Sequence, residues 1–166
     1  MKSLMSSLAL FSTITVGAFV GLGVRENDPA CAYACYNSIS SAPLGCSGTG
    51  RGGSHSHGAP PTSPTCRAGD VPFLTTLAYC ISLKCKEIPG LNLEQYWASH
   101  ATGSPDVLPK WTYAETLREV SIPPNSTYTR GSILDSTVLV DPTTYSIQVN
   151  FMVVFENVGV LQNVYT

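Results

Sequence analysis

Residues 70–90 read DVPFLTTLAYCISLKCKEIPG, and this stretch decides the fold that we expect. Asp70 is suited to cap a helix, and Pro72 falls in the first turn, where a missing N–H costs little. Pro89-Gly90 ends the pattern. Between these limits the apolar residues recur at steps of three and four, the spacing of one helical face. They are Leu74, Leu77, Ala78, Ile81, Cys85 and Ile88. The spacing therefore predicts a helix over 70–88 with one buried face.

Six cysteines lie on and before this stretch, at positions 31, 35, 46, 66, 80 and 85. Cys31 and Cys35 stand four apart in the run Ala30-Cys31-Ala32-Tyr33-Ala34-Cys35, so a helix there would place both sulfurs on one face. Zinc is the competing interpretation of a cysteine-rich chain, but no Cys-x-x-Cys knuckle occurs. An even number of cysteines at these spacings favours three disulfides over a metal site.

The pairing of the cysteines can be predicted from helix geometry, although six cysteines allow fifteen pairings. A loop returns the chain between the helix near 31–39 and the helix 70–88, so the two are expected to be antiparallel. An early cysteine on one helix then faces a late cysteine on the other. The prediction is Cys31–Cys85 and Cys35–Cys80, with Cys46–Cys66 closing the loop. In a regular helix the five-residue step from Cys80 to Cys85 turns the second sulfur ~140° around the helix axis from the first. Both sulfurs must face the same neighbouring helix, so the helix is expected to unwind at that end.

The first 23 residues have the layout of a secretory signal peptide. Lys2 gives a positive start, residues 8–20 are uncharged and mostly apolar, and Gly21-Leu22-Gly23 supplies small residues for cleavage. The alternative is a signal anchor, because residues 4–24 are long enough to span a bilayer. We expect cleavage, which leaves residues 24–166 as one extracellular cysteine-rich domain, secreted or at the outer face of the plasma membrane.

Charge excludes one class of partner. The 166 residues include 9 Lys and Arg against 11 Asp and Glu, a net charge of −2, and charged residues make up only 12%. Without a basic excess to neutralise phosphates, nucleic acid is not an expected partner. The longest later apolar run, residues 151–155, is too short for a membrane span.

The rest of the chain predicts two further helices and a β-hairpin. Asn92 is expected to cap a short helix over 93–98, and Thr112 with Glu115 fits a capping box for another that ends near Val120. Residues 136–140 and 145–149 are rich in β-forming residues on either side of a turn over 141–144, which predicts the hairpin. The expected fold class is therefore α+β, a small disulfide-linked helical domain followed by a C-terminal β-hairpin. Residues 144–166, apolar and without an obvious partner, are expected to be poorly stabilised.

Residues 44–65 form a loop rich in Gly, Ser, His and Pro. His55 and His57 in this loop could bind copper or zinc weakly. A solvated linker is favoured, because nothing fixes the geometry of the two histidines. His100 is expected at the surface after the 93–98 helix. Gly48, Gly50 and Gly53 match a dinucleotide-binding spacing but lack its βαβ context, so no cofactor is expected in this chain.

No catalytic motif emerges from the sequence. A Gly-x-Ser-x-Gly nucleophile motif does not occur. Asp135 and Asp141, six residues apart, could form a catalytic carboxylate pair, but turn-forming carboxylates are the favoured interpretation. Asn125-Ser126-Thr127 is the only Asn-x-Ser/Thr sequon, and it predicts a glycan at Asn125 in a secreted chain.

Several motifs occur in an order that resembles one known family. They are Cys31-Ala32-Tyr33-Ala34-Cys35, Thr62-Ser63-Pro64-Thr65-Cys66, Phe73-Leu74-Thr75-Thr76-Leu77-Ala78-Tyr79-Cys80, Cys85 and Leu93-Glu94-Gln95-Tyr96-Trp97. Together they resemble the extracellular N-terminal domain of fungal ferric reductase-like transmembrane proteins, from residue 30 to about residue 157. In that family a Trp-x-Tyr helix and a short β segment follow, and Trp111-Thr112-Tyr113 matches the first of these. The loop between Cys46 and Cys66 looks longer than the family's linker.

The resemblance implies a non-catalytic role for this chain in iron uptake. In the family, the haem-bearing membrane domain and the cytoplasmic FAD- and NADPH-binding domains carry ferric or cupric reduction, and no residue here matches them. We therefore expect no catalytic, cofactor-binding or metal residue in this chain, and we expect it not to be an enzyme. Its expected partner is the membrane domain of a metalloreductase, of which it would be a fragment or truncated product. The alternative is an independent small secreted disulfide-rich protein that binds or interacts at the cell surface.

Overall fold

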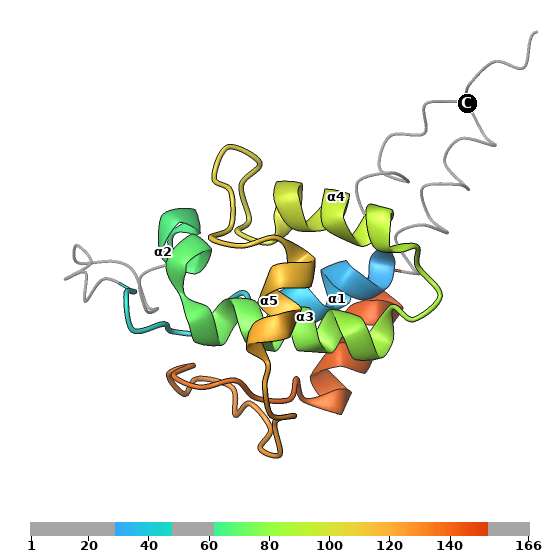
Figure 1. Cartoon of the computed structure of the whole chain (residues 1–166). Coiled ribbons are helices and arrows are strands. Elements are labelled where there is room, and N and C mark those ends of the chain that lie inside the picture. Colours follow the sequence, from blue (N-terminus) through green and yellow to red (C-terminus); the bar gives the residue numbers. More distant parts are fainter. Residues whose placement is uncertain (1–28, 48–61, 153–166) are drawn as a thin grey trace, which may run out of the picture.

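The computed structural model describes residues 29–47 and 62–152, and the regular secondary structure of that part of the chain consists of helices joined by loops (Figure 1). A further helix runs from 142 to 152, where the described residues end. The helices with both ends described are α1 (Ala30–Ile39), α2 (Pro64–Gly69), α3 (Val71–Lys84), α4 (Gly90–His100) and α5 (Tyr113–Glu119).

The helix α3 lies at the centre of the domain. The helices α1, α2 and α5 each pack on it, and α4 packs on α5. Its apolar residues Phe73, Leu74 and Leu77 are fully buried, as the spacing over 70–88 predicts. Asp70 caps it through a bond from the Phe73 N–H (2.9 Å) to Oδ1. The predicted cap is confirmed, but the helix ends at Lys84 and not at Ile88.

Two disulfides join α1 to α3 in the predicted nested order. Cys31 pairs with Cys85 and Cys35 pairs with Cys80, with Cα–Cα distances of 5.6 and 5.8 Å. The early cysteine of each helix meets the late cysteine of the other, so the helices are antiparallel. Cys85 has left the helix, with φ −110° and ψ 36°. The predicted unwinding at this end is confirmed, and it lets Cys85 reach the face of α3 that Cys80 occupies.

The two helices after α3 are present, one of them with a different start. Thr112 and Glu115 form the predicted capping box of α5, in which each side chain accepts from the backbone N–H of the other residue. The other helix, α4, begins at Gly90 after Pro89, so the prediction that Asn92 caps it is wrong. The proline fixes the backbone conformation before the helix, so α4 begins at the residue that follows it.

The predicted β-hairpin is wrong, and with it the α+β fold class, because the described residues contain no strand or sheet. Residues 145–149 lie within the helix 142–152. Asp141 starts this helix: its Oδ1 accepts from the N–H (2.7 Å) and the hydroxyl (2.8 Å) of Thr144. Pro142 stands in the first turn, as Pro72 does in α3. This Asp-Pro start outweighs the β-forming side chains that follow it.

Residues 134–139 pack on α3, and within the described residues their backbone forms isolated bridges, not a strand: Leu134 with Leu44 and Leu139 with Thr127. The Thr76 hydroxyl accepts from the Val138 N–H (3.1 Å), and the Thr75 and Thr137 hydroxyls are 2.7 Å apart. Leu134 is 2% exposed. The Leu139 N–H donates to the Ser126 carbonyl at 2.7 Å, so side chains of α3 and the segment 126–128 together satisfy this part of the backbone.

The short helix α2 was not predicted from the sequence, which assigned residues 44–65 to a loop. Ser63 caps α2 by accepting from the Cys66 N–H (3.1 Å), and Pro64 is its first residue. A Ser-Pro start is a recognisable helix signal. With only six residues, α2 contributes no buried residue of its own, so the apolar periodicity that reveals longer helices is missing.

Candidate functional site

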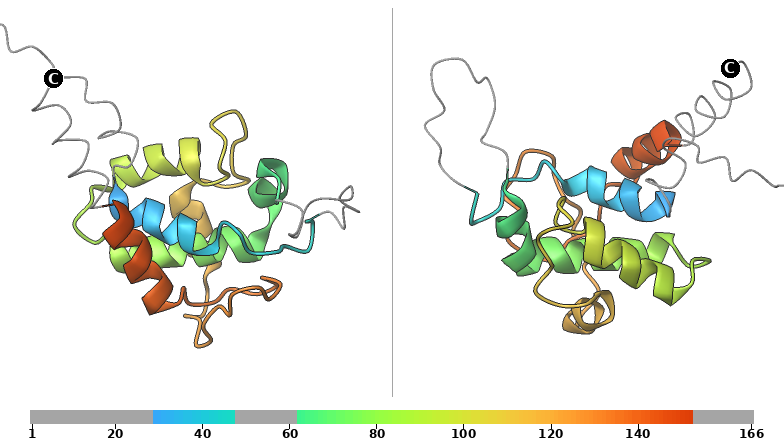
Figure 2. Two further views of the ribbon diagram at one scale, coloured as in Figure 1. Left: turned by 180° about the vertical axis from the view of Figure 1, so that it is seen from behind. Right: turned by 90° about the horizontal axis from the view of Figure 1, so that it is seen from above.

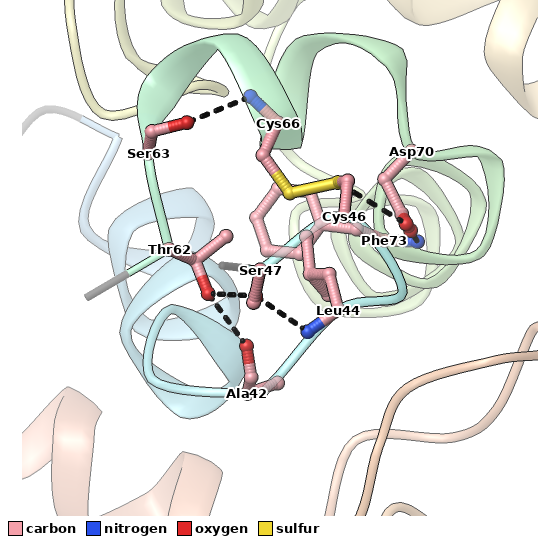
Figure 3. The surroundings of a disulfide bond; sticks show 9 residues. All are labelled: Ala42, Leu44, Cys46, Ser47, Thr62, Ser63, Cys66, Asp70 and Phe73. Atoms are coloured by element: carbon pink, nitrogen blue, oxygen red, sulfur yellow. Dashed lines mark hydrogen bonds between the residues drawn. A yellow bond between two sulfur atoms is a disulfide. The ribbon is translucent and has the colours of Figure 1, made fainter. Parts of the chain in front are cut away.

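The third disulfide closes the base of the loop that was predicted over 44–65. Cys46 pairs with Cys66 at a Cα–Cα distance of 5.6 Å, as predicted. Beside it, the hydroxyls of Ser47 and Thr62 are 2.7 Å apart, and the Thr62 hydroxyl donates to the Ala42 carbonyl at 3.1 Å (Figure 3). The two segments that flank residues 48–61 are thus tied to each other and to the end of α1.

Arg67 of α2 holds the C-terminal ends of two other helices together. Its guanidinium donates to the Ser40 carbonyl after α1 (2.9 Å) and to the Thr102 carbonyl after α4 (3.1 Å). The same group lies over the ring of Tyr36, 5.7 Å from its centroid. Helix C-termini carry partial negative charge, so a cation is favourable between them. Burial raises the pKa of Tyr36, and the charge of Arg67 opposes that effect.

Gly103 lies against this arginine in a conformation that favours glycine. Its φ is +82°, and a Cβ at this position would clash with the Tyr36 hydroxyl and lie 3.0 Å from the Arg67 guanidinium. Gly131 has a similar φ of +89°, but nothing lies within 4 Å of its would-be Cβ. Substitution of Gly131 therefore introduces backbone strain alone, whereas substitution of Gly103 introduces backbone strain and a steric clash.

We expect Gly103→Ala to lower the free energy of unfolding by about 2–4 kcal/mol, the sum of backbone strain and displacement of Tyr36 and Arg67. Gly131→Ala, the matched control, has the strain alone and should cost about 1–2 kcal/mol. Urea unfolding followed by circular dichroism measures both. Equal losses in the two variants would contradict the steric argument.

Glu94 of α4 caps the neighbouring helix α5. Its two carboxylate oxygens accept from the backbone N–H groups of Tyr113 and Ala114, each at 2.9 Å. The backbone N–H groups at a helix N-terminus have no partner within the helix, and they attract negative charge. The Glu94 carboxylate satisfies two of these groups and thereby joins α4 to α5. Burial, followed by the charge of Glu94, raises the pKa of Tyr113 to about 12.

Removing this carboxylate should loosen α5. We expect Glu94→Ala to lower the free energy of unfolding by about 1–2 kcal/mol, as for other lost helix caps. Glu87→Ala is the control: Glu87 is exposed and caps no helix, so its loss should stay within about 0.5 kcal/mol. Thermal unfolding of the two variants checks this. A Glu94→Ala chain as stable as the Glu87→Ala chain would show that the cap contributes nothing.

His100 is exposed, as predicted, and is the last residue of α4. Its ring stacks on Tyr96 with centroids 5.3 Å apart and meets the edge of Tyr33 at 5.1 Å. The Tyr96 hydroxyl donates to the Ala32 carbonyl at 3.2 Å. Burial raises the pKa of Tyr96 well above its ordinary value, with smaller contributions from Tyr33 and Tyr36. The cluster joins α1 to α4.

The predicted carboxylate residues have separate environments. Asp141 caps the helix 142–152, and the bonds from Thr144 lower its pKa. Asp135 is exposed and accepts from the Ser136 hydroxyl at 3.2 Å. Asp141 is thus a helix cap, and the turn that was predicted over 141–144 is the first turn of that helix. Asn125 of the sequon is exposed.

Other predicted features lie outside the described residues: the signal peptide 1–23, His55 and His57, and the glycine motif of Gly48, Gly50 and Gly53. In the part that the structure does describe, no three His, Cys, Asp or Glu side chains are grouped as metal ligands. None of the helices described is long and apolar enough to cross a membrane.

Comparison with known proteins gave no relative. No family model, no curated protein and no solved structure matches this chain.

Proposed function

We propose that this chain is the non-catalytic extracellular domain of a fungal ferric reductase-like membrane protein. In this role it covers the outer face of the membrane domain, where a ferric or cupric substrate arrives. The haem, FAD and NADPH that drive the reduction belong to other parts of that protein. The chain itself supplies a folded, disulfide-linked cover and no catalytic group.

The observation that supports this proposal is where the motif residues lie. The motifs that carry the resemblance are distant in sequence, yet in the structure they form one core. Cys35, Cys80 and Trp97 come from three different motifs, and all are buried in the same cluster. This arrangement is what we expect if the motifs mark a single folded domain.

The disulfides support the extracellular location. Three pairs use all six cysteines, and two of the pairs link the helices of the core. Disulfides of this kind form and persist in oxidising compartments. A chain whose core depends on them is suited to the outside of the cell.

The proposal is tested by locating the chain in the cell that makes it. An antibody raised against residues 62–152 should detect a band much larger than a 166-residue chain. That band should stay with the membrane fraction after an alkaline carbonate wash. A band of the size of this chain, free in the culture medium, would contradict the proposal and support an independent secreted protein.

The coding sequence downstream of the Thr166 codon gives an independent test. The proposal expects apolar spans with paired histidines, because haem in the membrane domain needs such ligands. A reading frame that closes without these spans would remove the membrane reductase from consideration.

A further inference from the structure

A polar hollow of about 390 Å³ lies between α1, the segment 127–130 and the helix 142–152. Figure 2 shows that this C-terminal helix, in red, lies alongside α1, in blue. The volume falls within the range of pockets that hold small molecules. None of the motifs discussed above accounts for this hollow, and the inference drawn from it does not depend on the proposed function.

Four of the side chains that line the hollow have hydrogen-bonding groups that are not used within the described part of the chain. Asn37 on α1 and Gln148 on the C-terminal helix are half-buried, and their amides have no partner among the described residues. The hydroxyls of Ser41 and Thr127 are also unpaired within that part of the chain. An amide presents a donor and an acceptor side by side, and a hydroxyl can act as either. The lining can therefore bind a ligand with many hydroxyl groups.

The charges around the hollow balance. Arg130 supplies one positive charge and Asp141 one negative charge, and the other lining residues are neutral. One oxygen of Asp141 already accepts two bonds from Thr144. A site for an anion such as phosphate would carry an excess of cations or several converging N–H groups. A neutral ligand fits this lining better.

We propose that the hollow binds a neutral sugar unit. Tyr128, partly buried against the core, is the aromatic residue in a lining of amides and hydroxyls. Sugars match that combination, because each ring carries an apolar face and a rim of hydroxyls. Most small-molecule pockets are largely apolar with a few polar groups. The lining of this hollow is mostly polar, so it favours a ligand that is itself mostly polar.

The sugar unit in the hollow has two candidate sources, which share the same chemistry. One is the glycan predicted at Asn125, which is exposed and only two residues before Thr127 at the rim of the hollow. Two residues of chain span at most ~7 Å, so the first sugars of a glycan at Asn125 are within reach of the hollow. The other source is an external saccharide.

The test uses the full chain secreted from a eukaryotic host, in its glycosylated form and as Asn125→Gln. The probes are di-N-acetylchitobiose, mannobiose and cellobiose, with binding followed by saturation-transfer NMR and calorimetry. We expect at least one probe to bind Asn125→Gln with a Kd near or below about 1 mM. If the same probe fails to bind the glycosylated chain, the glycan at Asn125 is the occupant. Equal binding to both forms identifies an external saccharide.

Variants of the two amides locate the binding. In the Asn125→Gln background, Asn37→Ala with Gln148→Ala should weaken binding at least tenfold. Asn92→Ala with Gln95→Ala is the matched control, since it removes the same residue types from exposed positions on α4. Circular dichroism verifies that both variants are folded. No binding of any probe to Asn125→Gln, or equal loss in both double variants, would overturn the proposal.

Discussion

Removal of both disulfides between α1 and α3 is expected to lower the free energy of unfolding by about 6 kcal/mol, whereas removal of either one should cost about 3 kcal/mol. The first variant replaces Cys31, Cys35, Cys80 and Cys85 with alanine. A loss of 6 kcal/mol is comparable with the whole stability of many domains. The four-alanine chain is therefore expected to be the least stable of all the variants described.

The expected losses for removing one bond and for removing both follow from the loops that the bonds close in the unfolded chain. When one bond between α1 and α3 is present, the other closes only a small ring through residues 31–35 and 80–85. When both are absent, the unfolded chain also regains the freedom of the segment between Cys35 and Cys80, shortened by the Cys46–Cys66 bond. The chain-entropy model gives about 3 kcal/mol for the small ring and about 3.5 kcal/mol for the longer loop.

Urea unfolding of the purified variants measures these losses. Cys46→Ala with Cys66→Ala serves as a control that removes one disulfide and leaves the α1–α3 pair intact, at a cost of about 3 kcal/mol. The m value should rise as bonds are removed, because the unfolded state expands. A four-alanine chain no less stable than either two-alanine chain would show that the two bonds do not act as described.

Trp97→Ala is expected to cost about 3–5 kcal/mol, the second-largest loss that we predict. Trp97 is 1% exposed, and its indole N–H donates to the Trp111 carbonyl at 2.8 Å. Its ring also contacts Tyr113, with centroids 5.7 Å apart. The truncation leaves a cavity between α4 and α5 and an acceptor without its donor. Both effects lower the stability of the folded state.

Two further substitutions distinguish the effect of the cavity on stability from the effect of the lost hydrogen bond. Trp97→Phe keeps an aromatic ring but loses the donor, and should cost about 1–3 kcal/mol. Trp111→Phe keeps the backbone carbonyl that accepts the bond, so it should cost less than Trp97→Phe. Urea unfolding ranks the three variants. A Trp111→Phe loss as large as that of Trp97→Ala would show that the ring of Trp111, and not the buried Trp97, stabilises this region.

The sequence predicts the parts of this fold that depend on local signals. Asp70 before Pro72 and the Thr112–Glu115 box each mark a helix start through bonds within one turn, so no knowledge of distant residues is needed. The disulfide pairing was predictable because the antiparallel arrangement and the cysteine spacing on two helices leave few geometries. The same capping rule, applied to Asp141 and Pro142, would have predicted the C-terminal helix.

The hairpin was predicted because residues 145–149 satisfy two patterns at once. Tyr145, Ile147 and Val149 alternate as in a strand, whereas Tyr145, Val149 and Met152 follow a helical spacing. In the structure Ile147 is 60% exposed and Met152 is 8% exposed, so the helical set faces inward. Short apolar segments are ambiguous in this way, and the helix start decides between the two patterns.

The contacts between elements had no signal in the sequence. Arg67 binds carbonyls that follow two other helices, and Glu94 caps a helix to which it does not belong. The hollow brings together Asn37, Thr127 and Gln148, which are far apart along the chain. Each of these depends on how helices pack, and neither periodicity nor local capping contains that information.

The most direct test of this account is non-reduced peptide mapping of the purified chain by mass spectrometry. The account predicts three linked peptide pairs, joining Cys31 to Cys85, Cys35 to Cys80 and Cys46 to Cys66. The first two bonds join the antiparallel helices of the core, and bonds of this kind form and persist in oxidising compartments. A Cys31–Cys35 bond, or any bond from Cys46 to Cys80 or Cys85, would contradict the fold. Free thiols at these positions would also contradict the proposed extracellular location.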